Sequence, residues 1–247
     1  MAWIAGNNER VNVGGGFGGS AGALPEAMAQ RFLARVYQTM AFGLAVTGIV
    51  ALIVASSASL REFFFTNPGV LFAVIIAQFA VVLGLTWLQS RIGEALMAAM
   101  FFGYAALTGV TFSLVFLVYT SSSIAGTFFV TAGAFAGLAV YGTLTKRSLD
   151  GLGSFAFMGL IGLILASIVN LWLHSPMMYW LTSFGGVIVF TGLTAYDASR
   201  LRQIAAQADL RSEVARKLVI QGALALYLDF INLFLYLLRF LGNRRRD

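Results

Sequence analysis

The residue in this sequence best placed to do chemistry is Asp229, because it lies in the middle of an apolar stretch from Leu218 to Leu238. An ionised carboxylate at the centre of a bilayer costs between about 3 and more than 10 kcal/mol. The side chain must therefore be neutral, be paired, or face a wet cavity. Its neighbours on the same helical face carry no positive charge: Ala225, Leu226, Asn232 and Leu233. A partner must come from another segment of the chain.

Asp197 is the acidic residue nearest in sequence that directly ends an apolar run, Gly192–Asp197. One interpretation is a local ion pair with Arg200, three residues further on, at the cytoplasmic interface. The other is a pair with Asp229, in which the two carboxyls share a proton and titrate as one unit. Such a pair would be a proton sensor. The sequence leaves both interpretations open.

Other kinds of chemistry find no support in the residues. The chain has no cysteine, so it has no disulfide, thiol nucleophile or thiolate metal ligand. His174 is the sole histidine and has no acidic residue nearby in sequence, so no metal site is predicted. Motifs of hydrolases, kinases and dehydrogenases are absent. We therefore predict neither an enzymatic activity nor a cofactor.

The composition is that of an integral membrane protein. The chain is 59% hydrophobic and 11% charged, with a mean hydropathy of +0.85, whereas soluble domains have about 25% charged residues. The net charge of +6 comes from basic residues that mostly flank apolar spans. In that position they orient the protein and contact anionic headgroups, which predicts membrane lipids as partners and no nucleic acid.

Seven stretches reach the length of about 20 apolar residues that a membrane helix needs. They run approximately over 36–60, 70–88, 95–120, 124–144, 153–173, 177–196 and 218–238. Pro25, Pro68 and Pro176 all lie outside them, as expected for unbroken helices. None of the stretches shows the alternation of a membrane β-strand. The predicted fold class is thus an all-α membrane protein with seven transmembrane helices.

The segment before the first span divides into two parts. Residues 1–24 contain the glycine-rich run Val13–Gly19 and are expected to form a disordered tail. This tail does not have the elements of a signal peptide in order, so we expect it to be retained. Residues from Pro25 to Arg35 are expected to form a short interfacial helix, and residues 25–247 one membrane domain.

The orientation follows from the distribution of the 16 Lys and Arg residues. With a cytoplasmic N-terminus, only five of them fall on the outer side: Arg61, Arg239, Arg244, Arg245 and Arg246. The positive-inside rule therefore favours an inner N-terminus and, with seven spans, an outer C-terminus. The basic run at the C-terminus argues for the opposite side.

Glycines within two spans predict close contacts between helices, because small residues let backbones approach each other. Gly133 and Gly137 stand four residues apart in the fourth span, and the sixth contains Gly185, Gly186 and Gly192. We assign these glycines a packing role.

The sequence resembles the Bax inhibitor-1 family of membrane proteins. The resemblance is most specific in the C-terminal third, over Ser183–Gly186, Gly192–Asp197, Leu226–Phe234 and Gly242–Arg245. The runs Arg35–Leu44 and Leu107–Val110 look like the family's first and third spans. Together these motifs extend the resemblance from about residue 30 to the end.

This resemblance implies two three-helix layers that wrap a central C-terminal helix. It also implies a pH-sensitive calcium leak controlled by an aspartate pair, which corresponds to Asp197 and Asp229. As candidate supporting residues of this pair we add Arg200, Asn232 and Gln78. Some relatives place an arginine in the second span as a latch on the pair. Here that span has no arginine, and Gln78 is its only strongly polar side chain.

Two hypotheses of different classes follow from the resemblance. The first is a proton-gated leak for calcium or other cations in the bacterial inner membrane. The alternative is a non-conducting regulator, since bacterial relatives are linked to a membrane-bound AAA protease as modulators of its activity. Calcium flux into liposomes that contain only this protein would discriminate between them.

Overall fold

The computed structural model describes residues 23–207 and 212–245. The predicted tail, residues 1–24, lies outside this range apart from Ala23 and Leu24, which belong to the first helix. In the described part the chain forms eight helices: α1 (Ala23–Ser56), α2 (Ala58–Phe65), α3 (Pro68–Trp87), α4 (Glu94–Val118), α5 (Ser121–Leu144), α6 (Asp150–Leu173), α7 (Pro176–Ala205) and α8 (Glu213–Leu241). All except α2 are long and apolar enough to cross a membrane. The prediction of seven transmembrane helices is confirmed.

The first helix differs from the expectation at both ends. No separate interfacial helix covers Pro25–Arg35, because α1 continues without a break into the first span. Pro25 lies in the first turn, where its missing N–H costs nothing, and Phe32 and Val36 are both fully buried on one helical face. The predicted span extended to residue 60, but α1 ends at Ser56, and Ser57 caps α2 by accepting a hydrogen bond from the Leu60 N–H (3.4 Å).

A tight connection makes α6 and α7 antiparallel neighbours. His174 ends α6 in the left-handed conformation, with φ at 49°. Asn170 Oδ1 accepts a hydrogen bond from the Ser175 N–H (2.9 Å), and the Ser175 hydroxyl in turn caps α7, which has Pro176 in its first turn. The sole histidine therefore has a local structural role at a helix end.

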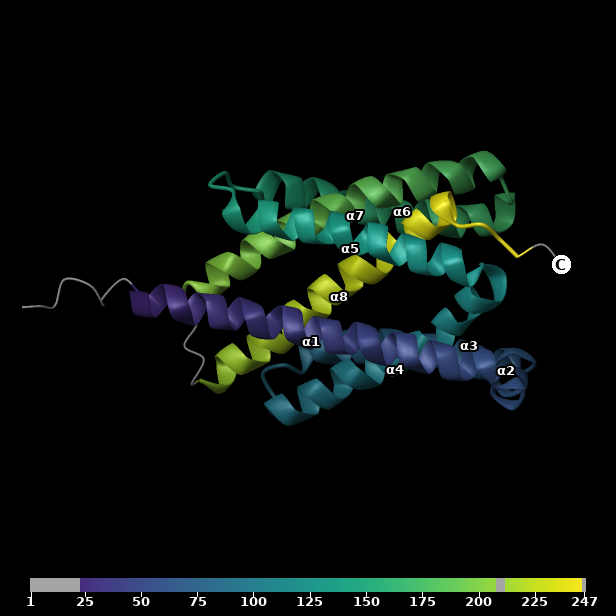
Figure 1. The fold of residues 1–247 in the computed structure, drawn as a ribbon, viewed down its shortest axis with the longest axis horizontal. Helices are drawn as coiled ribbons and strands as arrows, with labels where there is room; N and C mark the ends of the chain where they lie inside the picture. Colours follow the sequence, from purple (N-terminus) through teal and green to yellow (C-terminus); the bar gives the residue numbers. More distant parts are fainter. Residues whose placement is uncertain (1–22, 208–211, 246–247) are drawn as a thin grey trace, which may run out of the picture.

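The seven long helices form two layers with α8 between them (Figure 1). One layer contains α1, α3 and α4, the other contains α5, α6 and α7, and α8 packs against α1, α4, α5 and α7. Two thirds of the apolar window of α8 is buried (67%), whereas no other span exceeds 39%. The expected arrangement of two three-helix layers around a central C-terminal helix is confirmed.

The glycine predictions were right for α7 and wrong for α5. A Cβ on Gly186 would lie 2.5 Å from the ring of Tyr236, and one on Gly192 would lie 3.3 Å from Ala156. By contrast, Gly133 and Gly137 are exposed and have open space beside them. The buried face of α5 passes instead through Thr131, Phe135, Ala139 and Gly142, and a Cβ on Gly142 would lie 3.0 Å from the Cβ of Ala198 in α7.

The segment after α8 is tied to the connection between α4 and α5. The Thr120 N–H donates to the Asn243 carbonyl (3.1 Å), and the Arg245 N–H donates to the Val118 carbonyl (2.9 Å). The Asn243 N–H also donates to the Ser123 hydroxyl (2.9 Å). In Figure 1 this segment lies at the end of the bundle opposite the start of α1, as an odd number of spans requires.

Candidate functional site

Asp229 lies midway along α8, the helix with the most extensive cover from the rest of the protein. Its side chain is buried, with 4% of the residue exposed, between the buried residues Tyr227 and Phe230. The oxygen Oδ2 has no hydrogen-bond partner among the residues that the structure describes. A buried carboxyl oxygen without a hydrogen-bond partner lowers the stability of the folded protein. Asp229 is therefore not explained by a structural role.

Asp197 lies inside α7 and not at its end. The predicted span stopped at residue 196, but the helix continues through Ala205 because Ala198, Leu201 and Ala205 are buried in the main hydrophobic core. Asp197 itself is half-buried. Across the described chain, the ion pairs within 4.0 Å do not include one between Asp197 and Arg200, although the positive charge of Arg200 still interacts with this carboxyl.

The two carboxyls line the same cavity, which has a volume of about 900 Å³ and is formed by α3, α4, α6, α7 and α8. Gln78, Arg200 and Asn232 line it as well. The fold thus brings all five predicted site residues, from three helices, to one cavity between the two layers. That these five residues line one cavity is observed in the structure, whereas their functional roles remain a prediction.

The two amide side chains of the site make their hydrogen bonds elsewhere. Asn232 Nδ2 donates to the Leu228 carbonyl of its own helix (2.8 Å). Gln78 Nε2 donates to the Thr111 hydroxyl of α4 (3.2 Å), and this hydroxyl in turn donates to a main-chain carbonyl. Among the described residues neither amide donates to the carboxyls, and Gln78 connects α3 to α4.

Aromatic residues make up much of the rest of the cavity wall, and their proximity was not predicted from the sequence. Six line it: Phe79, Tyr104, Phe157, Phe190, Tyr196 and Tyr236. They come from five helices, so no spacing along the chain could have revealed the group. Each span contains so many apolar residues that helical periodicity does not separate the cavity face from the lipid face.

Two charged pairs at the N-terminal end of α8 are separate from this site. Arg216 forms an ion pair with Glu94, which joins α8 to α4, and Lys217 Nζ lies 2.9 Å from Glu213 Oε1. In the described part of the chain, no group of three or more His, Asp or Glu side chains could hold a metal ion. A cation in the cavity would therefore meet two carboxyls, Asp197 and Asp229.

Comparison with known proteins agrees with this architecture. The family model described as "Inhibitor of apoptosis-promoting Bax1" matches residues 29–246, almost the whole chain. The chain belongs to the Bax inhibitor-1 family. Within this family it is 49% identical to the inner membrane protein YbhL of Escherichia coli over 222 residues, which cover 90% of this chain and 95% of that one.

Two less similar relatives match a comparable share of this chain. An uncharacterized protein of Borreliella burgdorferi is 41% identical over 88% of this chain and 94% of its own length. Another from Caulobacter vibrioides is 37% identical over 89% of this chain and 91% of its own. With seven apolar helices and an inner membrane relative at 49% identity, this family member is a multi-pass inner membrane protein.

Proposed function

We propose that this protein is a pH-sensitive cation leak of the inner membrane, with calcium as the ion and Asp197 and Asp229 as the gate. The observation that carries the proposal is the buried, unpartnered Oδ2 of Asp229 on a cavity that Asp197 also lines. Structural carboxyls in membrane proteins are normally paired with a cation or a donor. An ionisable group left without a partner inside a membrane is by default a functional one.

The pair is suited to respond to protons because two neighbouring carboxyls in a poorly solvated site titrate together and not separately. A single proton shared between them leaves one negative charge, and its loss leaves two. The second charge attracts a cation and repels the first carboxyl, so the pair couples proton loss to cation entry.

The position of α8 suggests how this charge would act on conduction. The helix lies between the two layers and contacts both of them, with Asp229 at its midpoint and Asp197 on the neighbouring α7. Repulsion between the carboxyls would weaken the contact between α7 and α8 on the cavity side. A small displacement of α8 would then open a path between the layers, which makes this helix the plug of the proposed leak.

Flux measurements with the purified protein test the proposal. Liposomes that contain only this protein and a calcium-sensitive dye should take up calcium at a rate that varies with pH. Asp229→Asn should remove that variation, because the amide keeps the shape of the carboxyl but does not titrate. Glu62→Gln is the matched control, because Glu62 is an exposed carboxyl on α2 outside the cavity.

Uptake no faster than in protein-free liposomes at every pH would overturn the leak. The hypothesis of a non-conducting regulator would then stand. A pH-dependent uptake that Asp229→Asn leaves intact would keep the leak and overturn the aspartate gate.

A further inference from the structure

The cavity around the aspartates is much larger than an inorganic ion requires. Its volume of about 900 Å³ is in the range of small-molecule sites, about 300–1,000 Å³, which combine apolar and aromatic walls with a few polar groups. The cavity has that composition, since most of its wall is Phe, Tyr, Leu, Ile and Val and its polar groups include the two carboxyls. An inorganic ion would leave nearly all of this wall unused.

The type of wall and the sign of the charge together indicate a ligand class. Aromatic faces attract organic cations through the ring quadrupole, and cages of several rings are a recurrent way to bind quaternary ammonium groups. Here six aromatic side chains line the same cavity as two carboxyls, one of which has a buried oxygen without a partner among the described residues. An organic cation would offer charge to the carboxyls and apolar surface to the rings.

A tightly bound calcium ion, as distinct from one that only passes through a leak, would find few protein ligands here. It prefers six to eight oxygen ligands, whereas the described residues form no group of three or more His, Asp or Glu side chains that could hold a metal ion. Arg200, the only basic side chain among the described residues that line the cavity, adds a charge that opposes any cation. An organic cation can place its charged centre near Asp229 and gain most of its affinity from the walls.

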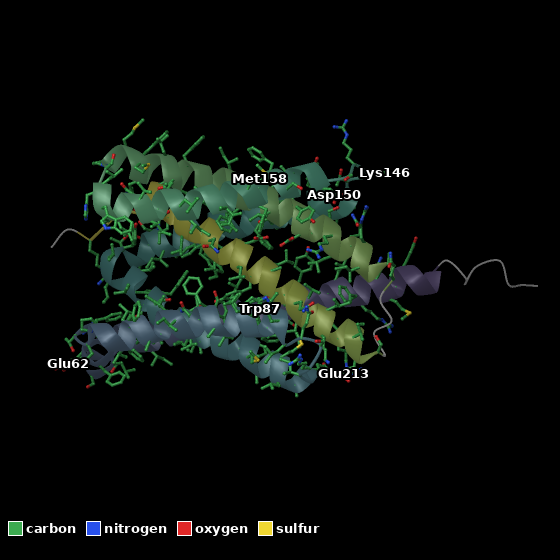
Figure 2. The ribbon with its side chains drawn as sticks, turned by 180° about the vertical axis from the view of Figure 1, so that it is seen from behind. Glu62, Trp87, Lys146, Asp150, Met158 and Glu213 are labelled. Atoms are coloured by element: carbon green, nitrogen blue, oxygen red, sulfur yellow. The ribbon has the colours of Figure 1, made fainter. Side chains whose placement is uncertain are left out.

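Two residues of the cavity wall lie on spans and are largely exposed, which indicates an opening toward the lipid. Phe79 of α3 and Phe157 of α6 both line it, yet 68% and 58% of these residues are exposed. They stand on the two different layers, between which α8 is seen to pass in Figure 2. In the membrane their exposed faces contact acyl chains, so a ligand that enters between α3 and α6 must first partition into the bilayer.

We infer that this cavity binds a lipophilic organic cation, such as an aromatic ammonium or phosphonium compound, that reaches it from the membrane between α3 and α6. The positive centre lies at Asp229 and Asp197, and the apolar body lies against the aromatic wall. The inference shares the carboxyl pair with the proposed function, but it holds whether or not the pair conducts ions.

Binding of tetraphenylphosphonium to the purified full chain in nanodiscs tests this inference by equilibrium dialysis against empty nanodiscs. Asp229→Asn should weaken binding at least 10-fold, whereas Arg200→Gln should strengthen it, because one change removes an attractive charge and the other a repulsive one. A loss of structure would not produce opposite effects. Triphenylphosphine oxide, a neutral aromatic compound, should bind at least 10-fold more weakly than the phosphonium.

A second variant, in the exposed part of the cavity wall, tests the inference if Asp229→Asn does not fold. Phe157→Ala removes a ring from the wall and should weaken binding about 3- to 10-fold, the scale of one cation–π contact. Phe155→Ala is the matched control, because Phe155 is similarly exposed on α6 (63%, against 58% for Phe157) but does not line the cavity. This variant should bind the phosphonium like the wild type.

The results separate this inference from the proposed leak. Equal binding by the wild type and both Asp229→Asn and Phe157→Ala, or equal binding of the neutral compound, would show partition into lipid only and overturn the organic-cation site. Aspartate-dependent binding without any calcium flux would overturn the leak and keep the site. Calcium flux without aspartate-dependent phosphonium binding would keep the leak and overturn the organic-cation site.

Discussion

The hydroxyl of Tyr227 in α8 lies 2.7 Å from Oγ1 of Thr47 in α1. Thr47 has one hydroxyl proton, which points to main-chain carbonyls at Ala105 of α4 (2.9 Å) and Gly43 of α1 (3.1 Å). Tyr227 is therefore the donor to Thr47. Both residues are buried, so this small network connects the central helix to the layer formed by α1 and α4, one turn or less from Asp229 along α8.

Thr47→Val should destabilise the protein more than Tyr227→Phe. The valine removes the Thr47 oxygen that accepts from the buried Tyr227 hydroxyl, at a cost of about 1–3 kcal/mol, whereas the phenylalanine removes the donor itself and costs about 0.5–1.5 kcal/mol. Hydrogen bonds between membrane helices average about 0.6 kcal/mol, so the lower halves of these ranges apply. Thermal unfolding in detergent measures the order of the two variants.

The control for this comparison is Thr86→Val. Thr86 is exposed on α3, and its hydroxyl donates only within its own helix, so the change should stay within about 0.5 kcal/mol of the wild type. A Thr47→Val protein as stable as this control would mean that the buried network contributes nothing to the position of α8.

Two glycines of α5 should respond in opposite ways to alanine. In Gly142→Ala the new Cβ would meet the Ala195 carbonyl and the Cβ of Ala198, both of them parts of α7 that can move only with the helix. We expect a clear loss of stability from this variant. Gly137→Ala enters open space and should stabilise the helix by about 0.5–1 kcal/mol, the usual difference between the two residues. The unfolding temperatures of the two variants, measured side by side, check the prediction, and similar values would contradict it.

These glycines also show where prediction from the sequence ends. Apolar length and the positions of the prolines were enough to find all seven spans, because a bilayer requires long continuous apolar helices. The face that each helix turns to its neighbours was not predictable, since the lipid-facing side is as apolar as the buried side. Gly133 and Gly137 were therefore assigned to a packed face, while Gly142, in the same helix, makes the close contact.

Of the candidate site, the charged residues could be predicted from the sequence, but the aromatic residues of the cavity wall could not. Asp229 stood out because a carboxylate in an apolar span requires an explanation, and Asp197 because it directly ends an apolar run. The resemblance to the family then favoured a pair of the two. Tyr104, Phe157 and Tyr236 line the same cavity, but each is an ordinary residue in its own span. Their proximity depends on how α4, α6 and α8 are placed around the cavity, which no local pattern specifies.

The C-terminus should lie on the periplasmic side. The segment after α8 lies at the end of the bundle opposite the start of α1, and the basic residues favour a cytoplasmic N-terminus. An alkaline phosphatase fused after Asp247 should therefore be active, and a fusion in the connection between α5 and α6, after Arg147, should be inactive. The reverse result would mean that the whole bundle is inserted in the opposite orientation.

Gln78→Ala should leave the pH midpoint of calcium uptake nearly unchanged. The amide of Gln78 is engaged with Thr111, and a neutral amide does not balance the charge of a carboxylate. Uptake by proteoliposomes across a pH series measures the midpoint. A displacement of more than about one pH unit, equivalent to about 1.4 kcal/mol, would show that Gln78 is coupled to the aspartates despite its hydrogen bond to α4.

The strongest test of the aspartate pair is its non-additivity. If Asp197 and Asp229 titrate as one unit, Asp197→Asn and Asp229→Asn should each flatten the pH dependence of calcium uptake, because either change leaves a single carboxyl without a like-charged neighbour. The double variant should then differ little from the single ones, since residues that share one equilibrium do not contribute additively. Calcium uptake by proteoliposomes is measured for the wild type, the two single variants and the double variant, which together form a double-mutant cycle. If Asp197→Asn kept the wild-type pH profile while Asp229→Asn abolished it, the two would not form a unit. Asp229 would then act alone, and Asp197 would be only a polar residue of the cavity wall.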